Sequence, residues 1–347
     1  MARAAVLESE ESRYRVALAD SRSRQNDDHA DCLDAMGGLA KILHEQGRNP
    51  EAELLLRKVL RIRSAKLGED IVTYDVMRRL GAALAAQKKF SEAETFFKQA
   101  LHGLNVHRGS LHSETLSCVR GLSNVLHRVG KLEEAEAFYR RALAGFQSKL
   151  GPKHDKTLAA AEGLAAVLRD EGKQEEAEMI YEKITTRMSA AYGEDSLPTL
   201  SVVGHRASNL REQGMLEEAE ELYRQVLRGL QAHYGKDDML CLSCMNKLAD
   251  VLQHQRKFLE SEQMFRATVA SLTKQLGEGH PETRKAMLGL AMVLKEQNLE
   301  EAGDLFQRLR PSIKTTHRRP ASWHARRGKS QLLDLDCSAN FNRQATA

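Results

Sequence analysis

The stretch that decides the fold of this chain is LEEAEAFYRRAL, residues 132–143. Its apolar positions recur at helical spacing, so a helix formed here has one apolar face and one charged face. Ala135 is small and is followed one helical turn later by the aromatic Tyr139. A small side chain lets two helix backbones approach to the short end of the roughly 8–10 Å packing range. The stretch therefore predicts an amphipathic helix that packs closely against other helices.

The same pattern returns along the chain at intervals of 41 or 42 residues. The small residue recurs at Ala52, Ala93, Ala135, Ala177, Ala219, Ser261 and Ala302. A glycine follows it 16 residues later at Gly68, Gly109, Gly151, Gly193, Gly235 and Gly277. A leucine precedes it by nine residues at Leu43, Leu84, Leu126, Leu168, Leu210 and Leu252, and by eight at Leu294. Three positions that stay in phase over six periods identify an internal repeat.

Each repeat is predicted to form two helices. The first begins at a capping residue, which is Asp70, Ser196, Asp238 or one of the histidines His29, His112, His154 and His280. It ends at a turn that holds Gly47, Gly130, Gly172 or Gly214, and the second helix ends at the repeated glycine. Both glycines are predicted to adopt a left-handed backbone conformation. Residues 1–28 are predicted to be a lone second helix, either a cap or the remainder of a truncated repeat. Residues 29–310 are predicted to form seven hairpins, and residues 311–347 a disordered basic tail.

Two other architectures repeat at about this length. Propeller blades need four strands each, and the chain lacks the alternating pattern of strands. HEAT and armadillo repeats share the length, but this chain pairs a small residue with a tyrosine, as at Ala177 and Tyr181, after a pair such as Leu164-Ala165. That combination favours tetratricopeptide packing. We predict an all-α fold, a right-handed superhelical solenoid of tetratricopeptide helical hairpins.

The segment GEGHPET, residues 277–283, and the stretch LEEAEAFYRRAL resemble the 42-residue tetratricopeptide repeats of kinesin light chains and nephrocystin-type proteins. The resemblance covers residues 1–310. It implies a non-catalytic scaffold or adaptor that binds peptide segments of other proteins in a concave groove lined by the first helices. It also implies a groove-lining asparagine at a position that Asn246 occupies here.

The outward positions of the first helices are rich in cations. They include Arg120, His127, Arg128, Arg169 and Arg211, and two acidic residues, Asp170 and Glu212, lie beside these cations in the sequence. A row of guanidinium groups suits bidentate recognition of carboxylates on a peptide. We therefore predict that short acidic peptide segments of partner proteins bind at Arg120, His127, Arg128, Arg169, Arg211 and Asn246. The alternative is an ordinary solvated face.

The cysteine and histidine patterns do not predict a reactive centre. Cys241 and Cys244 have the spacing of a zinc or redox motif. Other repeats have threonine, valine or alanine at the same positions, so packing residues are favoured. The four recurring histidines belong to different hairpins, at least about 8–10 Å apart, and therefore cannot share a metal ion. No phosphate-binding loop is present. We predict no enzyme activity, cofactor, metal or small-molecule substrate.

The formal charge of +4 is distributed unevenly over the 347 residues. From Pro311 onward, seven Lys or Arg and two Asp give +5, so residues 1–310 carry −1. The acidic positions of the second helices, such as Glu133, Glu134 and Glu136, are predicted to face solvent. No apolar run approaches the roughly 18 residues of a membrane span, and no signal-peptide pattern opens the chain. With five cysteines, an odd number, this predicts reduced thiols and a cytoplasmic protein.

The basic tail supports two further hypotheses. Charge alone would attach it to nucleic acid or to an anionic membrane, which is the rival interpretation of the chain. Leu332-Leu333-Asp334-Leu335-Asp336 alternates leucine with acid and resembles a clathrin-box peptide. The same chemistry suits the chain's own basic groove, so we predict that this segment docks on the first helices.

Overall fold

The computed structural model describes residues 2–24, 29–66, 68 and 70–309. Over these residues the chain forms fifteen α-helices and no β-strand, which confirms the all-α prediction. The helices are α1 (Ala2–Arg24), α2 (Ala30–Glu45), α3 (Asn49–Lys66), α4 (Ile71–Ala86), α5 (Phe90–Arg108), α6 (Ser113–Val129), α7 (Leu132–Leu150), α8 (Asp155–Asp170), α9 (Gln174–Tyr192), α10 (Leu197–Gln213), α11 (Leu216–Tyr234), α12 (Met239–His254), α13 (Phe258–Leu276), α14 (Pro281–Glu296) and α15 (Glu301–Leu309). The predicted basic tail and its leucine-acid segment lie outside the described residues.

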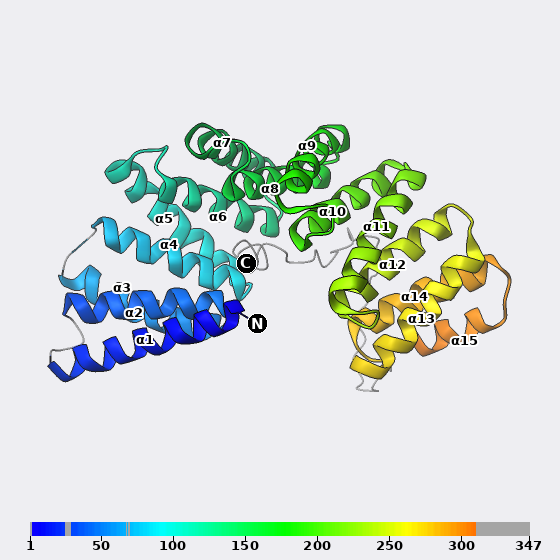
Figure 1. Ribbon diagram of the computed structural model, residues 1–347, viewed down its shortest axis with the longest axis horizontal. Helices are drawn as coiled ribbons and strands as arrows, with labels where there is room; N and C mark the ends of the chain where they lie inside the picture. Colours follow the sequence, from blue (N-terminus) through cyan, green and yellow to red (C-terminus); the bar gives the residue numbers. More distant parts are fainter. Residues whose placement is uncertain (1, 25–28, 67, 69, 310–347) are drawn as a thin grey trace, which may run out of the picture. The chain divides into compact units, whose positions relative to one another are not determined.

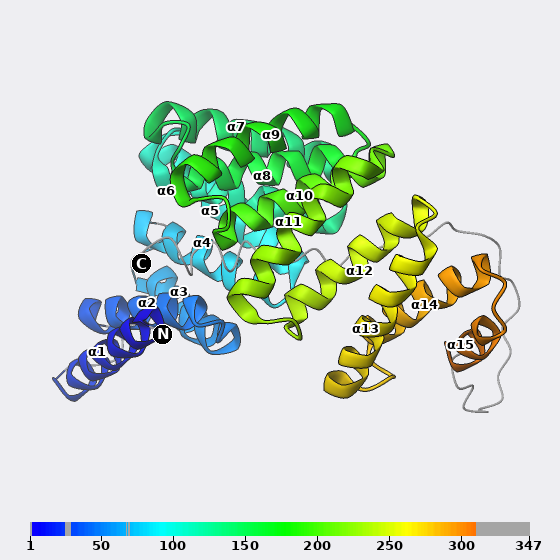
Figure 2. The same cartoon turned by 45° about the vertical axis from the view of Figure 1, so that its right-hand side comes forward.

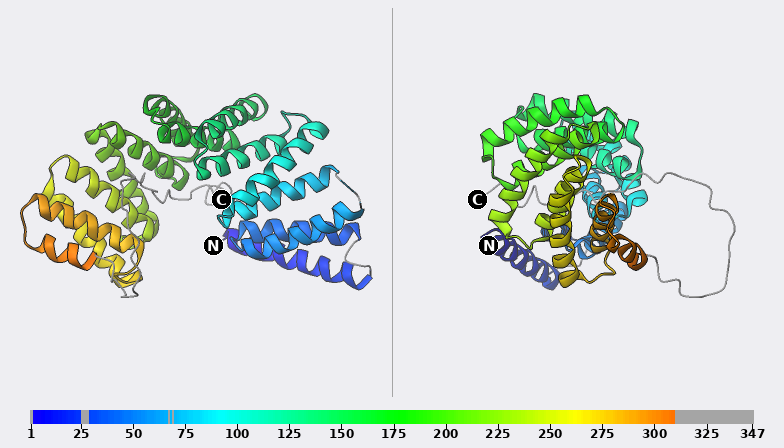
Figure 3. Two further views of the ribbon diagram at one scale, coloured as in Figure 1. Left: turned by 180° about the vertical axis from the view of Figure 1, so that it is seen from behind. Right: turned by 90° about the vertical axis from the view of Figure 1, so that its right-hand side faces the viewer.

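After α1, the helices follow one another as hairpins of a first helix, even-numbered, and a second helix, odd-numbered. They belong to two compact units: unit 1, whose described residues end at Arg187, and unit 2, whose described residues begin at Met188. In unit 1, the helices from α1 to α8 pack on one another in sequence order (Figure 1). In unit 2, α10 to α15 do the same (Figure 2). First helices of neighbouring hairpins also touch, as α4 touches α6 and α12 touches α14 (Figure 3).

Polar side chains cap the starts of the first helices. The backbone N–H two residues further on donates, at 3.1–3.4 Å, to the Nδ1 atoms of His29, His112, His154 and His280. Equivalent bonds go to the side chains of Asp70, Ser196 and Asp238. Each cap satisfies an N–H group that a helix start leaves without an intrahelical partner. The interpretation of the recurring histidines as helix starts is confirmed.

Glycine follows the second helices and some of the first helices, in two different conformations, whereas Lys88, Arg256 and Asn298 have positive φ in the turns after α4, α12 and α14. Gly130 and Gly214, after first helices, have φ of 85° and 82° with ψ of 15° and 7°, the predicted left-handed helical conformation. Gly109, Gly151 and Gly235, after second helices, also have positive φ, but their ψ is 163–169°. A left-handed helical conformation was predicted for these glycines as well. That prediction is wrong in ψ, because the chain leaves the second helix in an extended direction. Only glycine adopts this combination readily, which explains why the residue recurs.

The small residues of the repeat lie inside the helix packing. No exposed surface remains on Ala52, Ala93, Ala135, Ala177, Ala219 or Ser261. In unit 2, Ala219 and Tyr223 share a buried cluster with Leu248 on the next first helix. The Ser261 hydroxyl donates to the carbonyl of Ala249 at 2.7 Å, so the serine at this position is satisfied without solvent. The predicted register of the repeat is confirmed.

Ion pairs join the second helix of one hairpin to the hairpin that follows. In unit 1, Glu136 on α7 accepts hydrogen bonds from Arg140 Nε and from Lys173 Nζ, both at 2.6 Å. Arg140 also pairs with Glu176 at 3.0 Å. The lysine bond recurs as Lys89–Glu53 and Lys131–Glu94 in unit 1 and as Lys257–Glu220 in unit 2. These bonds make the charged side of the second helices a linking surface between hairpins.

The acidic face of α7 is therefore only partly solvated. Glu133 and Glu134 are exposed as predicted, but the Glu136 side chain is 15% exposed. The hydrogen bond from Lys173, followed by that from Arg140, lowers the pKa of Glu136 to about 2 despite desolvation. Its charge is consequently favoured in the folded state.

Ala135→Leu should lower the free energy of unfolding by about 1–3 kcal/mol, because leucine adds bulk where two helices touch. Glu133→Leu, at an exposed position of the same helix, should change it by no more than about 0.5 kcal/mol. Urea denaturation measures both. Equal effects would contradict the assignment of Ala135 to the interior.

Glu136→Gln should reduce the free energy of unfolding at pH 7 by about 1 kcal/mol or less, as expected for a largely surface ion-pair network. The folded pKa of Glu136 lies below the unfolded value, so this stabilisation is present above about pH 4.5 and is lost as pH falls towards 2. The difference between parent and variant should vanish over that range. Glu133→Gln is the matched control, and a Glu136 effect that persists at pH 2 would exclude the charge as its cause.

Candidate functional site

The residues predicted to bind peptides lie on four first helices. Unit 1 holds Arg120, His127 and Arg128 on α6 and Arg169 on α8, and unit 2 holds Arg211 on α10 and Asn246 on α12. Arg120 is half-buried and Arg128 is exposed.

In unit 1, one carboxylate brings two of the predicted residues together. Asp170 at the end of α8 accepts a 2.8 Å hydrogen bond from the ring of His127 on α6, and it accepts bonds from Arg169 at 2.9 and 3.1 Å. Desolvation raises the pKa of Asp170, but the bond from His127 and the charge of Arg169 hold it below its ordinary value. Arg169 was predicted to point outward, yet only 6% of it is exposed. The prediction is wrong on this point because the guanidinium folds back onto Asp170.

In unit 2, one predicted residue, Arg211, is paired with a carboxylate, and the other, Asn246, is buried. Arg211 donates to Asp250 on α12 at 2.6 Å, and its side chain is 22% exposed. Asn246 is 8% exposed, and its side-chain oxygen has neither accessible surface nor a hydrogen-bond partner among the described residues. Asn246 therefore does not present its amide on the surface as the resemblance implied.

The sequence patterns did not lead us to predict the role of a glycine that recurs in the first helices. At Gly38, Gly121, Gly163 and Gly289, an added Cβ would meet the ring of an aromatic residue 24 positions earlier. At Gly163 the gap to the Tyr139 ring would be 2.3 Å. Each glycine thus provides the space in which one hairpin seats its aromatic side chain against the next. The constant spacing between aromatic and glycine was the signal in the sequence.

The cysteines are packing residues, as predicted. Cys118, Cys241 and Cys244 are buried and form no disulfide. Cys244 lies 3.5 Å from the carbonyl of Tyr223, and burial raises the pKa of Cys118 and Cys244 to about 12. A thiol that stays protonated is a poor nucleophile and a poor metal ligand. Within the described part of the chain, no cluster of three or more His, Cys, Asp or Glu is placed to hold a metal ion.

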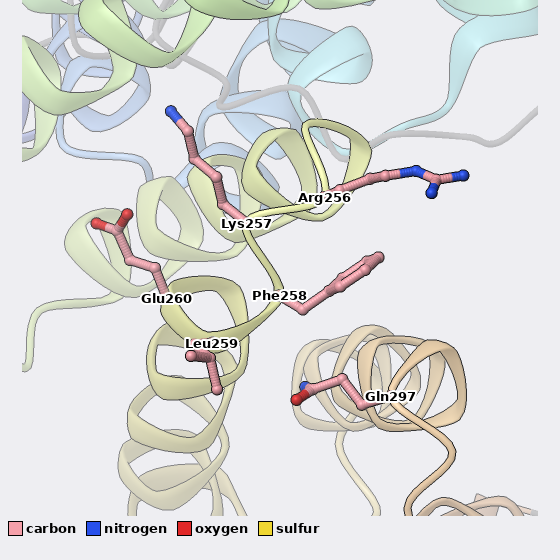
Figure 4. Close-up of a pocket in the computed structure, with 6 residues that line it drawn as sticks. All are labelled: Arg256, Lys257, Phe258, Leu259, Glu260 and Gln297. Atoms are coloured by element: carbon pink, nitrogen blue, oxygen red, sulfur yellow. The ribbon is translucent and has the colours of Figure 1, made fainter.

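An open hollow of about 400 Å³ lies in unit 2 beside the turn between α12 and α13 (Figure 4). Its lining consists of Arg256, Lys257, Phe258, Leu259, Glu260 and Gln297. Two of its polar groups already have partners, since Lys257 bonds to Glu220 and Gln297 bonds to Glu262 at 2.7 and 2.9 Å. Its carboxylate, Glu260, pairs with Arg224 on α11 at 2.5 Å. None of the described helices combines the length and apolarity needed to cross a bilayer.

Comparisons with known proteins agree with the helix packing. A family model described as tetratricopeptide repeat matches residues 113–190, 160–232 and 238–312. A second model with the same description matches residues 32–70 and 75–104. No curated protein matches the sequence.

Several solved structures share the fold. A Podosopora anserina protein described as a kinesin light chain with nearly identical repeats is 21% identical, with a TM-score of 0.52 over 56% of this chain and 92% of that one. BtubC from P. vanneervenii is 19% identical, with a TM-score of 0.54 over 69% and 96%. The Rap conjugation gene regulator of plasmid pLS20, in complex with the Phr* peptide, is 14% identical, with a TM-score of 0.53 over 80% and 72%. At these identities the likeness extends to the fold alone.

Gly163→Ala should lower the free energy of unfolding by about 1–3 kcal/mol, because the new methyl group overlaps the Tyr139 ring. Gly37→Ala is the control, since a Cβ there meets nothing within 4 Å inside α2. It should stabilise the helix by roughly 0.5–1 kcal/mol. Thermal melting of both variants measures the difference. Stabilisation by both changes would show that the tyrosine moves aside without cost.

Proposed function

The chain belongs to the tetratricopeptide repeat family, and from that membership we propose that it is a non-catalytic scaffold that binds peptide segments of partner proteins along its first helices. Members of this family generally mediate protein interactions. The Rap regulator, which shares the fold, was solved with a peptide bound. We further propose that this chain acts as an adaptor in the cytoplasm, in the manner of kinesin light chains.

The observation that carries the acidic-peptide proposal is the set of carboxylates already held by first-helix cations. Asp170 pairs with both His127 and Arg169, and Asp250 pairs with Arg211. These cations are therefore placed at carboxylate-binding distances before any partner arrives. Acidic side chains of a peptide would exchange with the internal carboxylates, so binding would be a replacement of one ion pair by another.

The chain carries a candidate competitor of its own. The segment from Leu332 to Asp336 has the composition of such a peptide. A flexible tether of 21 residues, the number from Pro311 to Gln331, would span about 25 Å. Tethering gives an effective concentration of about millimolar. We propose that this segment binds to the first-helix cations until a partner displaces it. The rival function, attachment to nucleic acid or an anionic membrane, rests on the charge of residues 311–347 alone.

Asp170→Asn should strengthen binding of a synthetic LLDLD peptide several-fold, because it releases His127 and Arg169 from their internal partner. Fluorescence polarisation of the labelled peptide measures this. Asp304→Asn makes the same change in net charge at an exposed second-helix position and should leave the affinity unchanged.

Two further arms complete this experiment. Arg169→Glu combined with Arg211→Glu should abolish binding, and it should also lower the melting temperature, because each glutamate would lie against the carboxylate that the arginine now pairs with. Removal of residues 331–347 should tighten binding, because the internal competitor is gone. Equal affinity for the LLDLD peptide in Asp170→Asn, Asp304→Asn and the parent would contradict the acidic-peptide proposal. Steep salt dependence that disappears on removal of residues 311–347 would favour the rival function.

A further inference from the structure

Three cationic side chains gather on consecutive first helices of unit 1. They are Arg78 on α4, Arg120 on α6 and Lys156 on α8, and these helices touch in that order (Figure 1). Lys156 reaches across to α6, where its Nζ donates to the Ser113 hydroxyl at 3.0 Å. The exposed Lys156 and the half-buried Arg78 open this cluster to solvent, while the Nε of the half-buried Arg120 has no accessible surface.

Arg120 is a donor without an acceptor. Its Nε has no accessible surface and no hydrogen-bond partner among the described residues. Burying an N–H of a charged group without an acceptor is unfavourable by more than burying a neutral one. Buried polar groups in folded proteins nearly always have a partner, so an acceptor brought to the Arg120 Nε by another molecule would be favourable. His127, Arg169 and Arg211 differ from Arg120 because each already has a carboxylate.

The nearby carboxylates do not neutralise this cluster. Asp75 is shared by Arg78 and Arg79 at 2.6 and 2.7 Å, and Glu114 pairs with Arg108 at 3.2 Å. The charge of Glu162 also acts on Arg120. The connected groups are five cations, Arg78, Arg79, Arg108, Arg120 and Lys156, and three carboxylates, Asp75, Glu114 and Glu162. An excess of two positive charges remains.

The electrostatic state of these groups agrees with that excess. Desolvation, together with the charges of Arg120 and Arg78, lowers the pKa of Lys156. Desolvation also lowers the pKa of Arg120, and Arg78 adds to the effect while Tyr139 and Glu162 oppose it. At Lys156, the repulsion from Arg120 and Arg78 therefore outweighs the attraction from Glu114, and an incoming anion would relieve this repulsion.

We propose that Arg78, Arg120 and Lys156 form a binding site for the phosphate of a phosphorylated serine or threonine on a partner peptide. The inference rests on the proposed function, in which a peptide lies along the first helices. A phosphate monoester carries nearly two negative charges at neutral pH and offers three acceptor oxygens, which match the charge excess and the number of cations. A peptide carboxylate supplies one charge and two oxygens, and so leaves part of the cluster unmatched.

The test uses the full chain and two small probes, N-acetyl-O-phosphoserine amide and N-acetyl-glutamic acid amide. They differ in little besides the dianion and the monoanion. Isothermal titration calorimetry at about 50 mM salt, where screening is modest, should give saturable binding of the phosphoserine probe at least about tenfold tighter than the glutamate probe. Arg120→Gln should weaken phosphoserine binding by about tenfold or more, the loss expected for one charged hydrogen-bonding group.

Arg266→Gln is the matched control, because it removes a second-helix arginine on α13 that already pairs with Glu262 and Glu301. It should leave the affinity for phosphoserine unchanged within about twofold. If Arg120→Gln lowers the melting temperature substantially, Lys156→Gln at the exposed rim supplies the same test, with an expected loss of about three- to tenfold.

Two results would overturn the site. Equal phosphoserine affinity in Lys156→Gln, Arg120→Gln and the parent would remove it, and so would the absence of saturable binding. Equal affinity for both probes would replace it with a carboxylate site. These outcomes are separate from the LLDLD experiment, which reports on Asp170 and not on Arg120. Phosphoserine binding without LLDLD binding would support the phosphate site and contradict the acidic-peptide function. LLDLD binding without phosphoserine binding would support the acidic-peptide function and contradict the phosphate site.

Discussion

The close contact between helices at one small residue per hairpin is the constraint on which the rest of the structure depends. At Ala135 no surface is left for solvent, so neither a larger side chain nor a different rotation of the helix fits. One turn later, Tyr139 reaches the next hairpin, where Gly163 leaves space for its ring. The small residue sets the distance within a hairpin, and the aromatic–glycine contact sets the distance to the following one. Each hairpin is thereby fixed on its neighbour.

This spacing determines which charges meet. Because successive first helices lie against one another, a cation on one helix faces the carboxylate of the next, as Arg211 faces Asp250 and His127 faces Asp170. On the second helices, the same order produces the bonds from Lys89, Lys131 and Lys257 to the preceding hairpin. Most of the charge is therefore neutralised inside the array. Arg120 differs, since its Nε has no acceptor among the described residues.

Features that depend on a single helix or on the repeat length were accessible from the sequence. The histidine caps follow from a polar residue at a fixed place before an apolar stripe, and the buried cysteines follow from the residues that replace them in other repeats. The glycine after the second helix was only half predictable. Its positive φ follows from the absence of a Cβ, but its extended ψ depends on the direction in which the next hairpin begins.

By itself the sequence determined an all-α chain of repeated hairpins, the residues at which first helices begin, and the small residues that turn inward. All of these depend on spacing along one helix or on one constant period. Only the tertiary structure decided the condition of the proposed binding residues: Arg169 folds onto Asp170, Asn246 is enclosed, and Arg211 is paired. Register specifies which helix faces which. It does not specify the side-chain distances between them, and at about 3 Å those distances decide whether a charge is paired or available.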